Sequence, residues 1–195
     1  MKSMVYKKTY KTPEIDKNEV LRYAKAAGDV ATARLLDRCI KESCDILTYN
    51  VCYGRYDISI SDDEIDLGFC RVKSHSLALC LGGCSEIVVF GATVGAGIDR
   101  LINKYSISSP SVAVMLQALG SERVEALCDV FCKELGEENN LRPRFSPGYG
   151  DLPLEIQSDI FRALDLTRNL GINLNDNLFM TPTKSVTAIV GIKKG

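Results

Sequence analysis

The feature that most constrains the fold is the irregular order in which strand-like and helix-like segments follow one another. A buried strand is predicted at 86–90 and a second, β-branched strand at 185–192. A long helical region, 109–135, lies between them, opened by Ser109-Pro110 as a cap and first-turn proline, with Gly120 as a candidate break. Because strands and helices do not alternate regularly, the sequence favours an α+β fold over a doubly wound sheet.

Shorter segments fill the rest of the chain. Residues 1–17 are predicted to form an irregular arm, and residues 50–60 to be extended. Asp29 and Ser74 are predicted helix caps. The predicted short helices cover 18–27, 29–47, 74–81, 98–105 and 154–170.

The composition excludes several classes of protein. The 195 residues carry 24 Lys and Arg against 25 Asp and Glu, a formal net charge of -1, without the basic excess of a dedicated nucleic-acid binder. No apolar run approaches the roughly 20 residues that span a bilayer. The basic stretch 1–11 has too few apolar residues for a secretory signal. We therefore predict a cytoplasmic protein with no nucleic-acid or membrane partner.

The cysteines and the single histidine limit the chemistry. Eight cysteines are present, but none forms the CxxC pair that zinc ribbons and iron–sulfur sites use. Most lie in apolar segments, so we interpret them as reduced core residues, with transient metal or redox use as the alternative. His75 is the only histidine. The acidic residues 62–66 are interpreted as a solvated turn, and no metal site is predicted.

A glycine-rich stretch, 91–97, connects the predicted strand 86–90 to the predicted helix 98–105. A phosphate-binding turn occupies this place in nucleotide-binding proteins. The spacing here is GxxxGxG instead of GxGxxG, and no Lys-Ser or Lys-Thr follows. Two interpretations stay open, nucleotide binding and a tight connection in which glycine permits close packing, and the spacing favours the second.

The segment 142–153 carries more specific chemistry. Prolines and glycines around Arg144 and Tyr149 stiffen it and expose backbone donors. A guanidinium binds a carboxylate bidentately, and a neighbouring aromatic ring receives a flat or cationic group. The loop therefore suits a zwitterionic, amino-acid-like ligand. The competing interpretation is a surface arginine and a tyrosine packed under a turn.

This segment resembles a known family. Arg144-Phe145-Ser146-Pro147-Gly148-Tyr149, followed by Pro153, is similar to the RxxPGYxxxP signature of the activation domain of cobalamin-dependent methionine synthase. Residues 83–95 resemble the family's free-standing members, and the segments 171–174, 180–182 and 185–188 resemble its downstream motifs. The resemblance implies a mixed or antiparallel twisted sheet with flanking helices.

The resemblance also implies a domain organisation and a set of ligand-binding residues. Residues 73–195 are implied to form an S-adenosylmethionine-binding core, with residues 1–72 as a helical and extended region packed on it in one compact unit. Arg144 matches the arginine that binds the ligand's carboxylate. Tyr149 matches the tyrosine between ligand and corrin and is the candidate catalytic residue. The other implied ligand-binding residues are Ser146, Gly148, Ser185 and Val186. Candidate acidic contacts are Glu125, Asp129 and Glu134, among which the sequence does not choose.

The activity that the resemblance implies is the repair of methionine synthase, in methionine biosynthesis. S-adenosylmethionine and one electron convert inactive cob(II)alamin to methylcobalamin, which makes the chain part of a methyltransferase system. The sequence has no D-x-H-x-x-G corrinoid motif. Cobalamin, vitamin B12, is therefore expected on a corrinoid-bearing partner synthase, and the electron from a flavodoxin or ferredoxin-type donor. The alternative is a non-catalytic docking or stabilising module for a corrinoid protein.

Overall fold

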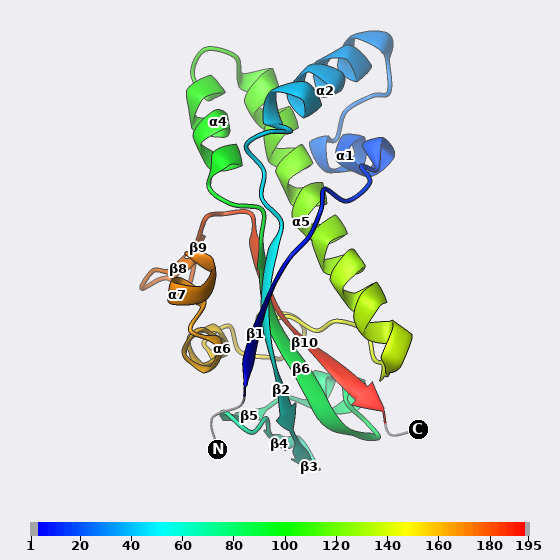
Figure 1. The fold of residues 1–195 in the computed structure, drawn as a ribbon, viewed down its shortest axis with the longest axis vertical. Helices are drawn as coiled ribbons and strands as arrows, with labels where there is room; N and C mark the ends of the chain where they lie inside the picture. Colours follow the sequence, from blue (N-terminus) through cyan, green and yellow to red (C-terminus); the bar gives the residue numbers. More distant parts are fainter. Residues whose placement is uncertain (1–3, 194–195) are drawn as a thin grey trace.

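The computed structural model describes residues 4–193, which form an open five-stranded sheet with helices on both faces (Figure 1). Every strand is antiparallel to its neighbours. This arrangement confirms the predicted α+β class with an antiparallel sheet. The strand order is β1 (Val5–Thr9), β2 (Asn50–Asp57), β6 (Cys84–Thr93), β10 (Ser185–Lys193) and β7 (Asn140–Leu141).

The central strand β6 is buried on both faces. Val88 and Phe90 point into one core, and Ile87 and Val89 into the other, and all four are fully buried. Successive side chains of a strand point to opposite faces, so a strand covered on both sides is a continuous apolar run. The predicted strand 86–90 is therefore confirmed, and the structure extends it to Cys84–Thr93.

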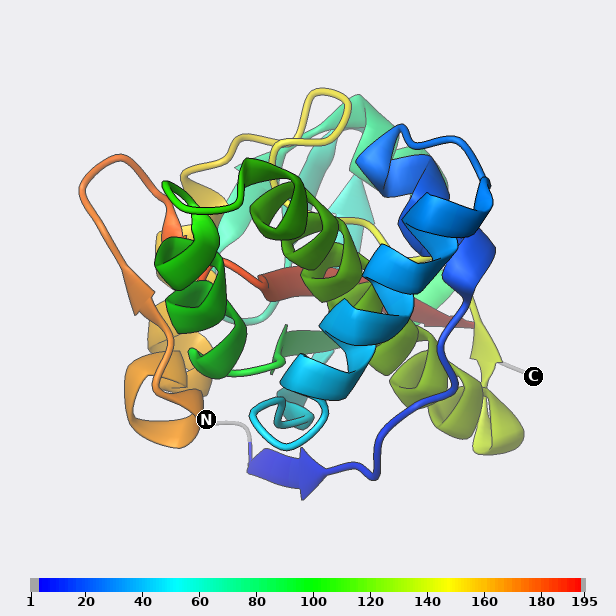
Figure 2. The ribbon, with the colours of Figure 1, turned by 90° about the horizontal axis from the view of Figure 1, so that it is seen from above.

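α5 (Pro110–Glu138) packs on the first face of the sheet, and three further helices of the same core, α1 (Lys17–Ala24), α2 (Val30–Ser43) and α4 (Gly97–Tyr105), pack around α5 (Figures 1 and 2). α5 runs for 29 residues without a break, which corrects the candidate break at Gly120. Pro110 lies in the first turn as predicted, but Ser109 makes no side-chain cap hydrogen bond. Neither α5 nor any other helix within residues 4–193 is long and apolar enough to cross a membrane.

The second face is covered by shorter elements that pack on the other core. The predicted helix 154–170 is in fact two helices, because Asp165 adopts a left-handed φ of 48° between them. The acidic stretch 62–66 is a turn only at its start and then a strand. The elements are α3 (His75–Cys80), α6 (Ile156–Leu164), α7 (Leu166–Leu170), β3 (Ser59–Ser61), β4 (Glu64–Asp66), β5 (Arg71–Lys73), β8 (Asn173–Leu174) and β9 (Met180–Thr181).

The N-terminal region is more regular than predicted. Part of the predicted arm forms β1 and pairs with β2 at the sheet edge, and its residues 1–3 lie outside the described residues, as do 194–195 at the other end. α1 ends before Lys25, which takes a left-handed conformation, and not near Gly28. Asp29 caps α2 as predicted, accepting the Thr32 N–H at 2.8 Å. The division of the chain at residue 72 stays a prediction.

Close packing accounts for two glycines of the stretch 91–97. Gly91 lies inside β6, where a β-carbon would be 2.7 Å from Leu166 Cδ2. Gly97 opens α4, where a β-carbon would be 2.3 Å from the Ile46 carbonyl oxygen. Neither position has room for a side chain. The structure therefore supports the interpretation of this stretch as a tight connection.

Candidate ligand-binding site

The loop 142–153, between β7 and α6, runs beside β10. The Arg142 N–H donates to Gly191 O at 2.8 Å, and Phe145 exchanges two hydrogen bonds with Ile189, at 2.9 and 2.8 Å. The proline between these residues has no N–H to donate, so the pairing is interrupted instead of forming a regular strand. The loop is thus fixed to the central sheet immediately before its bend.

The bend itself depends on two glycines with positive φ, Gly148 at 84° and Gly150 at 56°. The Tyr149 N–H donates to Ser146 O at 3.2 Å, and the Leu152 N–H donates to Tyr149 O at 3.0 Å. A β-carbon at Gly150 would lie 2.7 Å from Ser76 Oγ. These constraints make the bend a closed, stiff turn that presents Tyr149 outward.

Asp151 anchors the bend to α3, and sequence reasoning missed it. Its carboxylate accepts hydrogen bonds from Ser74 Oγ (2.6 Å), the His75 N–H (2.8 Å) and the Ser76 N–H (3.1 Å). The hydrogen bond from the Ser74 hydroxyl is the main cause that holds the pKa of Asp151 well below its usual range. Asp151 therefore caps a helix from 75 residues away, which no local pattern predicts.

Arg144 reaches from the loop to α5. Its Nη2 donates hydrogen bonds to Glu125 Oε2 at 3.2 Å and Asp129 Oδ1 at 2.8 Å, and its side chain is 26% exposed. Burial opposes the charged form, but the neighbouring Cys128 and the two carboxylates outweigh it, so the pKa of Arg144 is raised. Arg144 is therefore a fixed cation and not a free surface side chain.

The structure separates the three candidate acidic residues. Glu125 and Asp129 lie beside Arg144, one helical turn apart on α5. Glu134 lies further along the helix, where it binds Lys8 Nζ and the Tyr10 hydroxyl. Glu134 therefore does not lie beside Arg144. Glu125 and Asp129 are the two remaining candidates for the acidic ligand contact.

A cavity of about 320 Å³ lies between the loop, α5 and β10. It brings together four of the six predicted ligand-binding residues. The ring of Tyr149 is 68% exposed, so the interpretation of a tyrosine packed under the turn is wrong. Glu125 lines the cavity and Asp129 does not, which makes Glu125 the better-placed acidic group. The lining residues are Glu125, Arg144, Phe145, Ser146, Tyr149 and Val186.

The remaining two predicted residues lie next to this cavity. Gly148 shapes the bend without lining the cavity. Ser185 lines an adjoining groove of about 850 Å³ that shares Tyr149 and Glu125 with the cavity. The Ser185 hydroxyl lies 2.8 Å from Pro182 O and 2.9 Å from Thr93 Oγ1, so it is already engaged within the fold. The part that each of the six residues plays in ligand binding stays a prediction.

All eight cysteines lie within the described residues as unpaired thiols; Cys39, Cys52 and Cys128 are buried, whereas Cys44 is exposed. Burial is the main cause that raises the pKa of Cys39 and Cys52 to about 11 and that of Cys70 to about 12. Such groups remain protonated near neutral pH. Between residues 4 and 193, no cluster of three or more His, Cys, Asp and Glu side chains is placed to hold a metal ion. The prediction of core cysteines is therefore confirmed for the three buried thiols and is wrong for exposed Cys44.

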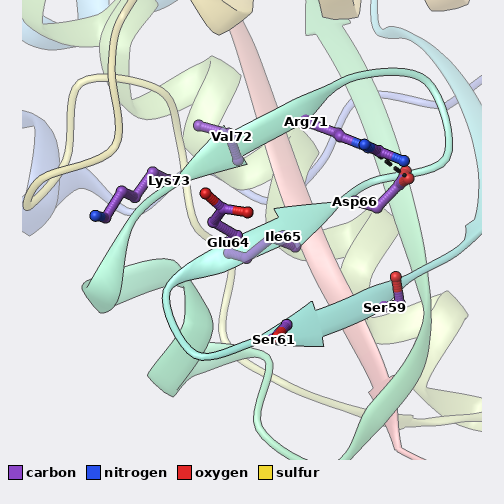
Figure 3. A pocket seen from close by; sticks show the side chains of 8 residues that line it. All are labelled: Ser59, Ser61, Glu64, Ile65, Asp66, Arg71, Val72 and Lys73. Carbon is purple, nitrogen blue, oxygen red and sulfur yellow. Dashed lines mark hydrogen bonds and ion pairs between the residues drawn. The ribbon is translucent and has the colours of Figure 1, made fainter.

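A separate hollow of about 410 Å³ lies on the outer face of the three-stranded sheet β3–β4–β5 (Figure 3). Its charged side chains are of both signs, and one ion pair crosses between two strands. Arg71 Nε donates to Asp66 Oδ2 at 3.1 Å, and Glu64 lies opposite Lys73 in the register. The hollow is open and carries charged side chains of both signs, so it has the character of a solvated sheet face.

The fold is similar to that of a solved structure, the crystal structure of the MetH reactivation domain bound to AdoHcy. The comparison has a TM-score of 0.70 at 17% sequence identity and covers 97% of this chain and 78% of that chain. The two therefore share a fold of mixed helices and an open antiparallel sheet. No protein-family model matches the sequence, and no curated protein matches it.

Proposed function

We propose that the chain binds S-adenosylmethionine at the Arg144–Tyr149 loop and supports the reactivation of a cobalamin-dependent methionine synthase. The observation that carries the proposal is the placement of Arg144, Glu125 and Tyr149 around one cavity. Further support comes from the fold, which is shared with a reactivation domain whose structure holds AdoHcy. The motif around Arg144 points to the same family.

The charges of the cavity match an amino-acid end group. Arg144 contacts both carboxylates through Nη2, and a guanidinium has five N–H donors. We expect donors that these two carboxylates do not use to bind a ligand carboxylate. Glu125 is available to the ligand's ammonium group or to the positive sulfonium, because its side chain is 43% exposed. Arg144 and its two carboxylate partners carry one positive and two negative charges. A ligand with one carboxylate, one ammonium group and one sulfonium therefore complements their net charge.

Tyr149 is placed to position the reactive methyl group. Its exposed ring stands on a stiff bend beside Arg144, and the negative face of an aromatic ring attracts a cationic centre. Binding the amino-acid end at Arg144 then holds the sulfonium next to Tyr149. Proximity and orientation supply the catalytic effect, and no protein acid or base is needed.

The reaction itself involves a corrinoid substrate held by a partner methionine synthase. A flavodoxin or ferredoxin-type donor supplies one electron, which reduces cobalt(II) to cobalt(I). Cobalt(I) then attacks the methyl carbon with its electron pair and displaces the thioether: a cobalt–carbon bond forms, the sulfur–carbon bond breaks, and the neutral thioether leaves. In this scheme the chain acts as a separate reactivation component and contributes the methyl donor in the correct orientation.

Isothermal titration with S-adenosylmethionine and S-adenosylhomocysteine tests the proposal. We expect both to bind, and methylthioadenosine, which lacks the amino-acid end, to bind more weakly. Arg168→Met, on the exposed surface of α7, is the matched control for the variant Arg144→Met. Arg168→Met should leave ligand binding unchanged. Absence of heat with both ligands, alone and with the partner synthase, contradicts the proposal.

One observation favours the second candidate, a docking module that stabilises a corrinoid protein without transferring methyl groups. Arg144 is already neutralised by two carboxylates of its own chain, as in a structural ion pair. Complex formation that persists in Arg144→Met and Tyr149→Phe variants, and that does not respond to S-adenosylmethionine, supports this second function over the first.

A further inference from the structure

Lys184 lies immediately before β10 and lines the groove of about 850 Å³ beside Tyr149. Its aliphatic stem packs on α5 where Gly120 leaves room, since a β-carbon there would lie 3.0 Å from Cγ and 3.1 Å from Cε of the lysine. Its Nζ donates a hydrogen bond to Ser121 Oγ at 3.0 Å. The fold therefore directs this ammonium group along α5 into the groove.

The charge of Lys184 has no carboxylate partner in the part of the chain that the structure describes. The nearest acidic influence is Asp99, whose carboxylate is engaged by the Thr183 N–H at 2.7 Å and the Thr183 hydroxyl at 2.6 Å. Burial lowers the pKa of Lys184 even though Asp99 opposes the shift. A half-buried cation whose hydrogen-bond partner is a hydroxyl group is stabilised when an anion binds beside it.

The rest of the groove suits a small molecule. Its volume lies within the range of about 300–1,000 Å³ that is usual for ligand sites. Pro110, Ala113 and Val114 form an apolar wall, and Gln117 and Ser121 supply polar contacts. Glu125, the acidic group in the groove, is paired with Arg144. An occupant with an apolar or aromatic body and one negatively charged group matches this lining.

We propose that the groove is a second binding subsite, in which Lys184 holds an oxyanion, either a carboxylate or a phosphate, carried by a small molecule. The subsite goes beyond the proposed function, which assigns the amino-acid end of the ligand to Arg144 in the adjoining cavity. Tyr149 and Glu125 line both spaces, so an occupant of the groove lies next to the methyl-donor site.

Competitive acetylation of the intact protein, read lysine by lysine by mass spectrometry, tests the subsite. Inorganic phosphate, acetate, and the pair AMP and adenosine are the probes, and exposed Lys133 on α5 is the internal reference. We expect an oxyanion probe to protect Lys184 and not Lys133. Protection by phosphate and by AMP, but not by adenosine, identifies a phosphate ligand, and protection by acetate alone identifies a carboxylate ligand.

The variants Lys184→Met and Lys184→Arg sharpen the test, because both retain the packed stem. Lys184→Met should weaken binding of the protecting anion about tenfold or more, the loss expected of one charge-assisted hydrogen bond. Lys184→Arg should restore most of the affinity, and Lys133→Met should have no effect. Equal binding by wild type and Lys184→Met, or no protection of Lys184 by any anion, overturns the proposal.

The failure of this inference is distinguishable from the failure of the proposed function. If S-adenosylhomocysteine binding depends on Arg144 while Lys184 is never protected, the subsite is absent and the proposed function stands. If phosphate protects Lys184 while neither adenosyl compound binds, the subsite stands and the proposed function fails.

Discussion

Two arginines, Arg123 within α5 and Arg144 beside it, form ion pairs with different roles. Arg123 is fully buried and pairs with the neighbouring Glu122. It also donates to the carbonyl oxygens of Pro13 (2.7 Å) and Glu14 (2.6 Å), and Glu122 accepts the Asp16 N–H at 3.1 Å. The pair therefore fixes the N-terminal arm to the helix, with its charges satisfied by the fold.

Arg144 meets carboxylates of the same helix at the wall of a cavity. Its partners are 43% and 72% exposed, whereas Glu122 is 4% exposed. An exposed pair contributes little to stability, and its groups can exchange partners when a ligand arrives. The comparison teaches that enclosure, more than the presence of a salt bridge, separates a structural arginine from a binding one.

The largest effect is expected for Arg123→Met. Removing the cation leaves Glu122 buried and unpaired, which should lower the free energy of unfolding by about 3–5 kcal/mol. Chemical denaturation measures the change. Arg144→Met is the matched control and should cost far less. Equal losses in the two variants contradict the distinction between the enclosed and the open pair.

The next effect is on ligand affinity. Arg144→Met should weaken S-adenosylhomocysteine binding by about 1.5–3 kcal/mol, the range for a hydrogen bond to a charged group. Methylthioadenosine has no carboxylate, so its affinity should hardly change. Calorimetry measures both, and a loss of equal size for the two compounds points to a collapsed cavity instead of a lost carboxylate contact.

A smaller difference should separate the two acidic partners of Arg144. Glu125 lines the cavity and Asp129 does not. Glu125→Gln should therefore weaken binding by about 1 kcal/mol, and Asp129→Asn should leave it nearly unchanged. A larger loss of affinity in Asp129→Asn than in Glu125→Gln contradicts the proposed geometry.

The smallest effect is expected for Asp151→Asn, because this carboxylate is exposed. Its pKa is lowered in the fold from an ordinary value of 3.8, so its contribution to stability is present above that pH and is lost as the pH falls below it. The melting temperature of the variant should lie below that of wild type near neutral pH, and the two should converge in acid. A pH-independent difference contradicts the capping role.

Local signals in the sequence predicted local features well. Asp29 and Ser74 cap their helices, since a cap depends on residues three positions away. The strand 86–90 was predictable because both of its faces are buried. The break at Asp165 depends on packing against the sheet, and the pairing of β1 depends on a strand some 45 residues away, so no local pattern reports them.

Only part of the candidate site was predictable, because only part of it is encoded by residues close together in the sequence. The Arg144–Tyr149 motif lies in one short stretch of sequence, and the four-residue spacing of Glu125 and Asp129 predicts a common helix face. Which of them meets the arginine depends on how the loop docks on α5. Asp151 and Lys184 act through contacts with residues 63–77 positions away, which a single sequence does not specify.

A crystal structure of the protein with S-adenosylhomocysteine is the most direct test of the central claim. We expect the ligand in the cavity of the loop, with its carboxylate on Arg144, its ammonium group facing Glu125 and its sulfur beside the Tyr149 ring. A ligand bound elsewhere, with the ion pairs of Arg144 unchanged and the cavity empty, contradicts it.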